Sequence, residues 1–170
     1  MNAMKTIKVE KVTLNIGAGK DQNLLNKGVK LLKNITGIEP VKTITQKRIP
    51  GWGLRPGLPI GCKITLRGKK SEELLSRLFK AKDNQLDKNC FDSNGNLSFG
   101  IHEYIDIPEA EYDPDIGIIG LQASVTLTRP GFRVKIRNIK KSSIGKAHKI
   151  TKEESMKFFN EKFKITVGEL

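Results

Sequence analysis

Residues 60–67, IGCKITLR, alternate between apolar and polar side chains, which is typical of a β-strand with one buried face. Apolar residues and a cysteine occupy positions 60, 62, 64 and 66. The side chains of Lys63, Thr65 and Arg67 alternate with them and face the other way. This strand predicts a sheet that is covered on one side and exposes a polar, basic surface on the other.

The same period-two pattern recurs along the chain. Further strands are predicted at residues 12–16, 41–49, 97–101 and 118–127. Pro130 and Gly131 then predict a turn, because proline fixes φ and glycine supplies a positive φ. After this turn FRVKIRN, residues 132–138, is expected to return as a strand with Arg133, Lys135 and Arg137 facing outward.

Three segments have the apolar spacing and end signals of helices. Asp21 is expected to cap the first helix and Gly37 to end it. Ser71 is expected to cap the second helix, and TKEE at residues 151–154 is a capping box for the third. Residues 81–96 are interpreted as a connecting loop. This order predicts a single α+β domain with a largely antiparallel sheet, helices packed on one face and a basic open face.

The positive charge is segregated along the chain of 170 residues, whose net charge is +13. Residues 40–71 contain eight Lys or Arg residues, residues 116–152 contain nine, and neither tract contains an acid. This distribution favours a nucleic-acid partner over a uniformly solvated surface. Residues 103–115, EYIDIPEAEYDPD, carry six acids, which suit either a solvated loop or a contact with a basic protein.

Two basic segments lack periodicity, and the first of them is also rich in glycine and proline. They are interpreted as flexible basic loops at about residues 47–60 and 138–150. The first includes Trp52, the only tryptophan, whose ring either stacks on a base or ribose or folds back on the core. No apolar run approaches the roughly 20 residues of a membrane span, and no signal peptide is recognisable, so we expect a cytoplasmic protein without membrane contact.

No motif for catalysis is complete. GAGKD, residues 17–21, lacks the spacing of a phosphate loop and of a dinucleotide fingerprint, so it is either a strand–helix turn or a site for one RNA phosphate. Cys62 and Cys90 are isolated and read as plain thiols, and His102 and His148 as surface or packing residues. We therefore predict no enzyme, metal or cofactor. A nucleotide-using enzyme and a DNA-binding architectural protein are the alternatives, the second disfavoured by the absence of a recognition-helix pattern.

Three stretches carry a resemblance to a known family: NIGAGKD, ITQKRIPGWGLRPGLPIGCKITLRG and FGIHEYIDIPEAEYDPDIGIIGL. Together they resemble the universal ribosomal protein five of the large subunit, in its archaeal form, from about residue 6 to residue 165. The resemblance implies a structural protein of the central protuberance that binds 5S ribosomal RNA. The 5S contacts that it implies are Asn15, Thr45, Gln46, Lys47, Arg48, Lys63, Thr65 and Arg67.

The resemblance also implies two further partners. The loop at residues 50–59 is expected to reach the peptidyl-site (P-site) transfer RNA, and a protein in the head of the small subunit is expected to form an inter-subunit bridge. The residues implied for the transfer-RNA loop are Gly51, Trp52, Gly53, Arg55 and Gly57. The resemblance does not extend to Arg133, Lys135 and Arg137, which are assigned to large-subunit ribosomal RNA on charge alone.

Overall fold

The computed structural model describes residues 2–168 and confirms the α+β domain. Its main sheet has five antiparallel strands in the order β2-β3-β1-β6-β5. The bounds of these strands are Lys8–Gly17 for β1, Val41–Ile44 for β2, Pro59–Leu66 for β3, Leu97–Ile101 for β5 and Leu121–Thr128 for β6. A second sheet pairs β4 (Gln85–Asp87) in parallel with β7 (Thr166–Gly168).

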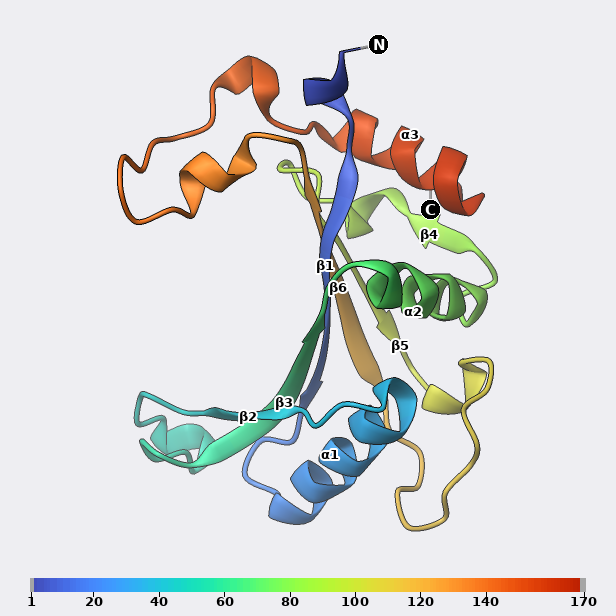
Figure 1. The fold of residues 1–170 in the computed structure, drawn as a ribbon. Helices are drawn as coiled ribbons and strands as arrows, with labels where there is room; N and C mark the ends of the chain where they lie inside the picture. Colours follow the sequence, from blue (N-terminus) through green and yellow to red (C-terminus); the bar gives the residue numbers. More distant parts are fainter. Residues whose placement is uncertain (1, 169–170) are drawn as a thin grey trace.

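Three α-helices lie on the same side of the main sheet (Figure 1): α1 (Gln22–Thr36), α2 (Lys69–Lys80) and α3 (Lys152–Phe163). The carboxylate of Asp21 accepts hydrogen bonds from the backbone N–H groups of Asn23 and Leu24, as a cap of α1 should. Gly37 ends α1 with φ of 69°, and Thr151 forms the predicted capping box with Glu154. The short 3-10 helices are Ala3–Lys5, Pro50–Trp52, Lys88–Cys90, Tyr104–Asp106, Phe132–Lys135 and Lys146–His148.

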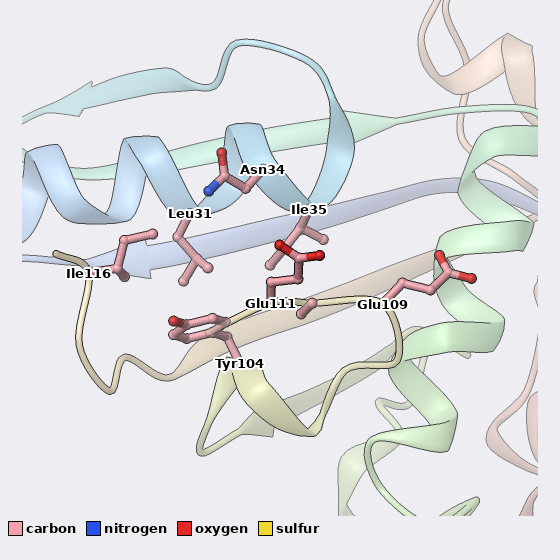
Figure 2. A pocket seen from close by; sticks show the side chains of 8 residues that line it. Leu31, Asn34, Ile35, Tyr104, Glu109, Glu111 and Ile116 are labelled. Carbon is pink, nitrogen blue, oxygen red and sulfur yellow. The ribbon is translucent and has the colours of Figure 1, made fainter. Parts of the chain in front are cut away.

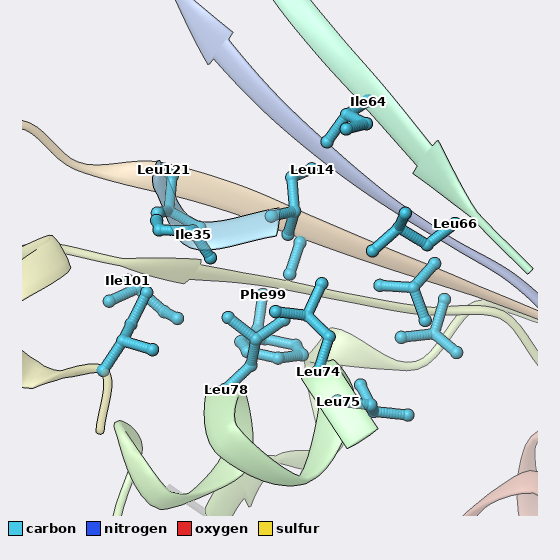
Figure 3. Packing of buried hydrophobic residues seen from close by; sticks show 14 of the residues in the cluster. Leu14, Ile35, Ile64, Leu66, Leu74, Leu75, Leu78, Phe99, Ile101 and Leu121 are labelled. Carbon is cyan, nitrogen blue, oxygen red and sulfur yellow. The ribbon is translucent and has the colours of Figure 1, made fainter. Parts of the chain in front are cut away.

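The hydrophobic core fills the space between the main sheet and the helices. Leu14 and Leu66 from the sheet face Leu74 and Leu78 from α2 (Figure 3). The ring of Phe79 then joins three elements, because its centroid lies 5.5 Å from that of Phe99 on β5 and 5.9 and 5.3 Å from those of Phe159 and Phe163 on α3. Burial of this face against the helices leaves the opposite face of the sheet uncovered.

The prediction of a strand at residues 132–138 is wrong. Gly131 has φ of 96°, and residues 132–135 form a 3-10 helix in which the Val134 N–H donates to the Gly131 carbonyl at 3.2 Å. The physical reason lies in the sheet order: β6 already pairs with β1 on one side and β5 on the other. A returning strand would have no free edge of β6 to pair with.

Other predicted boundaries also need correction. Ser71 does not cap α2; Gly68, with φ of 70°, precedes the helix, and the buried Ser71 hydroxyl donates to the Gly68 carbonyl at 2.6 Å. The strand predicted at 41–49 ends at Ile44, where a bulge interrupts its pairing with β3. The loop predicted at 81–96 contains β4, the strand predicted at 12–16 spans residues 8–17, and that predicted at 118–127 begins only at residue 121.

Candidate nucleic-acid interface

The side of the main sheet turned away from the helices carries polar side chains, and we call it the open face. Strand register sets Lys63 opposite Asn15 and Asn15 opposite Gln122, so these three side chains share that side. On β1, β3, β5 and β6 the polar side chains of the open face are Lys11, Thr13, Asn15, Lys63, Thr65, Ser98, Gln122, Ser124 and Thr126, and the exposed Val41 of β2 lies beside Lys63 on the same side. It therefore unites three of the predicted 5S contacts, Asn15, Lys63 and Thr65, which come from two strands far apart in the sequence.

Two basic segments project from the open-face side of the sheet, near its two ends (Figure 1). We call them the 45–58 loop and the 129–150 segment. Their exposed basic residues are Lys47, Arg48 and Arg55 in the first and Arg133, Lys135, Arg137, Lys140, Lys141, Lys146 and Lys149 in the second. Between these segments, most side chains of the open face carry hydroxyl or amide groups. Most of the cations therefore border the open face rather than lie on it, and the face is less positively charged than the sequence predicted.

Arg67 lies just beyond the end of β3 and is exposed. Its guanidinium forms an ion pair with Glu10 at 3.3 Å, beside the bulge in β1. Both side chains remain accessible to solvent, so this pair contributes little to stability and leaves Arg67 able to turn toward an anionic partner.

The 45–58 loop has a defined backbone. Ile49 and Leu54 exchange two backbone hydrogen bonds of 3.0 and 3.1 Å, which close a small hairpin, and the Leu54 side chain is buried. Gly53 at the tip has φ of 67°, a left-handed conformation that glycine adopts without strain. Trp52 beside it is 70% exposed. The tryptophan therefore does not fold back on the core and presents its ring at the tip.

Thr45 is the one predicted 5S contact whose side chain is buried. It is 7% exposed and its hydroxyl has no hydrogen-bond partner, while its backbone pairs with Leu58 and Gly57 at the base of the loop. Gln46, Lys47 and Arg48, which follow it, are exposed. The structure thus places the neighbours of Thr45 on the surface, and Thr45 itself reaches a partner only if the base of the loop opens.

The 129–150 segment is held by Arg129, which is 5% exposed. Its Nη1 donates to the carbonyls of His148 and Lys149 at 3.3 and 3.2 Å, and its Nη2 donates to Glu154 at 2.8 Å. The Thr151 N–H, and then the Arg129 guanidinium, hold the pKa of Glu154 below its ordinary value. Sequence analysis missed Arg129; the available signal was an arginine ending an apolar strand, with a capping-box glutamate downstream.

A hollow of about 480 Å³ lies where the 129–150 segment meets the open face. Lys11 and Thr126 line it from the sheet, and Phe132, Lys135 and Lys149 line it from the segment. The ring of Phe132 packs edge-on against His148, whose Nε2 lies 2.9 Å from the Pro130 carbonyl, so His148 is a packing residue as expected. The hollow connects the cations of the segment with the polar surface of the sheet.

The GAGKD turn uses its own donors internally. The N–H groups of Ala18 and Gly19 both donate to the Ile60 carbonyl, at 2.9 and 3.0 Å, and Asp21 occupies the amino end of α1. A phosphate would have to displace these partners. The geometry therefore favours the strand–helix turn over the phosphate site.

Residues 103–115, which we call the acidic strap, are fastened to the helices. Lys30 on α1 lies 2.7 Å from Asp113 and 3.2 Å from Asp115, and Arg77 on α2 donates to the Pro108 carbonyl at 2.9 Å. The buried hydroxyl of Tyr104 accepts a hydrogen bond from the Asp113 N–H. The strap is thus packed and partly neutralised, in contrast to a simple solvated loop.

A pocket of about 300 Å³ separates the strap from α1 (Figure 2). Its lining residues are Leu31, Asn34, Ile35, Tyr104, Glu109, Ala110, Glu111 and Ile116. The pocket is on the helix side of the molecule, away from the open face, and it brings together none of the residues predicted to bind RNA.

The described part of the chain shows few features of metal or thiol chemistry. Across residues 2–168, no group of three or more His, Cys, Asp or Glu side chains is arranged to hold a metal ion. Cys62 is buried and Cys90 is half-buried, both as free thiols, and burial raises the pKa of the Cys62 thiol. In the same range no helix has the length and apolar character needed to cross a membrane.

Comparison with known proteins gives one consistent result. Residues 2–55 match the family model for ribosomal protein L5, and residues 59–158 match the model for the C-terminal part of the same family. Large ribosomal subunit protein uL5 of Sulfurisphaera tokodaii is 46% identical over 170 residues, covering 99% of this chain and 96% of the relative. The uL5 proteins of Nanoarchaeum equitans and Methanosphaera stadtmanae are 47% and 41% identical, covering 96% and 98% of this chain and 97% and 99% of the relatives.

Proposed function

Because the chain belongs to the ribosomal protein L5 family, we propose that it binds 5S ribosomal RNA through the part of its open face formed by β1 and β3 and through its 45–58 loop. It is a structural constituent of the large subunit of the cytoplasmic ribosome and not an enzyme. The observation that carries the proposal is the convergence of Asn15, Lys63 and Thr65 on one uncovered sheet surface, beside the exposed cations Lys47 and Arg48.

The chemistry of these groups suits an RNA backbone. Lysine and arginine neutralise phosphates and release condensed counterions, which makes the affinity depend steeply on salt. Threonine and asparagine side chains add hydrogen bonds to phosphates and sugars, which fix the orientation of the RNA on the protein. Lys47, Arg48 and the polar surface beside them would thus act together on 5S RNA.

Two of the remaining partners are assigned to exposed surfaces of the protein, and the third, a small-subunit protein, rests on the family resemblance alone. Arg133, Lys135 and Arg137 are exposed on the 129–150 segment and are proposed to bind large-subunit ribosomal RNA. Gly51–Gly57 at the tip of the 45–58 loop, with Trp52 and Arg55 exposed, is proposed to contact the P-site transfer RNA. A small-subunit head protein is proposed as the partner in an inter-subunit bridge.

A matched pair of charge reversals tests the 5S assignment. Lys63→Glu places a negative charge on the open face, and Lys27→Glu makes the same change on the exposed side of α1, behind the sheet. Like charges brought together cost several kcal/mol, so we expect Lys63→Glu to weaken binding of a 5S transcript at least about tenfold. We expect Lys27→Glu to bind within about twofold of wild type.

Gel-shift titration at fixed salt gives both affinities, and circular dichroism checks that each variant is folded. Nuclease footprinting of total ribosomal RNA with the wild-type protein then identifies the RNA that it protects. Equal weakening by both reversals would mean that net charge, rather than the open face, determines binding. If the protein protected other ribosomal RNAs but not 5S RNA, the proposed partner would be contradicted.

A further inference from the structure

Neutral hydrogen-bonding side chains continue across the open face, beyond the residues that the proposed function uses. Register places Thr65 opposite Thr13, Thr13 opposite Ser124, and Ser124 opposite Ser98. This row of four hydroxyls crosses β3, β1, β6 and β5. At the roughly 4.8 Å spacing of neighbouring strands, the row is about 14 Å long.

These side chains are only lightly engaged with one another. The Ser98 hydroxyl donates to Ser124 at 3.1 Å, the hydroxyls of Thr13 and Thr65 lie 3.4 Å apart, and the Asn15 amide donates to Gln122 at 3.5 Å. Each hydroxyl can donate one hydrogen bond and accept two, and each amide has two donors and an acceptor. A large part of the hydrogen-bonding capacity of these hydroxyl and amide side chains is therefore free to face outward.

The composition of this surface selects a partner. A protein interface is built around an apolar centre, and this row has none. A ribose 2′-hydroxyl both donates and accepts, and RNA duplexes display these groups in a wide, shallow minor groove. The exposed cations Lys47 and Arg48, in the projection beside β3, would supply the complementary charge for the phosphates of the same molecule.

We infer that Ser98, Gln122 and Ser124, on β5 and β6, extend the RNA-binding surface and recognise ribose 2′-hydroxyls. The inference rests on the proposed function, because it takes the partner of the open face to be RNA. It adds a division of roles: the bordering cations supply affinity that depends on salt, while the neutral row distinguishes RNA from DNA. Neutral contacts release no counterions, so their loss leaves the salt dependence of binding unchanged.

The test uses the full chain with the double substitution Ser98→Ala and Ser124→Ala. Both serines are exposed and bond to each other, so removing both hydroxyls leaves neither without its partner. The control is Ser76→Ala, which removes an exposed hydroxyl from α2 on the helix side. The probes are a 5S ribosomal RNA transcript and DNA of the same sequence, each titrated at several salt concentrations.

We expect the double variant to bind the RNA about fivefold to thirtyfold more weakly than wild type, with the same salt slope and unchanged DNA binding. Ser76→Ala should match wild type. Gln122→Ala is a second, independent variant, and we expect it to lose RNA affinity as well, by a smaller factor. Circular dichroism and thermal unfolding check that the variants are folded.

Three outcomes would overturn the inference, and they are distinguishable. Wild-type RNA affinity in the double variant and in Gln122→Ala would show that β5 and β6 lie outside the interface, while the proposed function stands. An equal loss of affinity for RNA and for DNA would rule out recognition of the ribose 2′-hydroxyl. Failure of the wild-type protein to bind the 5S transcript would overturn the proposed 5S partner and this inference together.

Discussion

Replacement of Arg129 by methionine tests how the 129–150 segment is held. Methionine keeps a flexible apolar stem in the buried site and removes the charge and its hydrogen bonds. The carbonyls of His148 and Lys149 lose a donor, and Glu154 loses its cation. We expect the segment to detach from α3 and the protein to lose stability while the main sheet stays folded.

The magnitude follows from the geometry. Nη1 divides its hydrogen bonding between two carbonyls and Nη2 donates to a carboxylate, which amounts to about two charge-assisted hydrogen bonds of roughly 1.5–3 kcal/mol each. Two effects offset part of this loss of stability. Methionine avoids the cost of burying a charge, and the Glu154 side chain, 43% exposed, regains water. We therefore expect a net loss of about 2–3 kcal/mol, or about 4–12 °C in Tm.

Denaturant unfolding followed by circular dichroism measures the loss. Arg133→Met is the matched control, because Arg133 is exposed on the same segment and should stay within about 0.5 kcal/mol of wild type. Hydrogen exchange adds local resolution, since the Phe132 and Val134 amides donate to carbonyls within the segment and should exchange faster in Arg129→Met. An unfolding free energy within 0.5 kcal/mol of wild type would refute the stabilising role of Arg129.

Three further predictions concern charge, stacking and pH. Replacing Arg133, Lys135 and Arg137 together by glutamine should lower the slope of log affinity against log salt for ribosomal RNA by about 2–3, measured by filter binding, and an unchanged slope would exclude phosphate contacts there. Trp52→Ala should leave 5S affinity within twofold of wild type but alter the transfer-RNA footprint on assembled ribosomes, and an identical footprint would contradict the contact at the loop tip. The folded-state pKa of Glu154 is lowered, so its stabilising contribution is present above the ordinary value of 4.5 and is lost as pH falls through the folded pKa. Wild type should therefore exceed Glu154→Gln in unfolding free energy at pH 6, and the gap should narrow as the pH falls below 4.5; a constant gap would contradict this assignment.

The sequence predicted the parts of the fold that depend on local patterns. The alternation around Lys63 and the caps at Asp21 and Thr151 are local signals, and the structure confirms each of them. The strand predicted at 132–138 failed because its outcome depends on the neighbours of β6 in the sheet. No local pattern contains that information. The three-residue strand β4 was missed for the same reason, because its partner lies near the end of the chain.

The predicted site shows the same limit. The sequence indicated which residues are basic and which strands expose them, and strand pairing then united Asn15 with Lys63. It did not show that Thr45 is buried, since its burial accompanies backbone hydrogen bonds to Gly57 and Leu58 that close the base of the loop. It also gave no weight to Ser98 and Ser124, because serine in a strand stands out only once its cross-strand neighbours are known.

The open face lies between its two basic projections, and this arrangement affects how a bound polymer is released. Under the proposed assignments, once one projection holds its RNA in the assembled subunit, the other meets its own RNA at high effective concentration, because the sheet fixes the span between them. Complete dissociation then requires both attachments to break before either one forms again. We therefore expect a protein built this way to leave its RNA more slowly than either projection alone would allow, and a defect in one projection to shorten that residence time more than it slows the initial encounter.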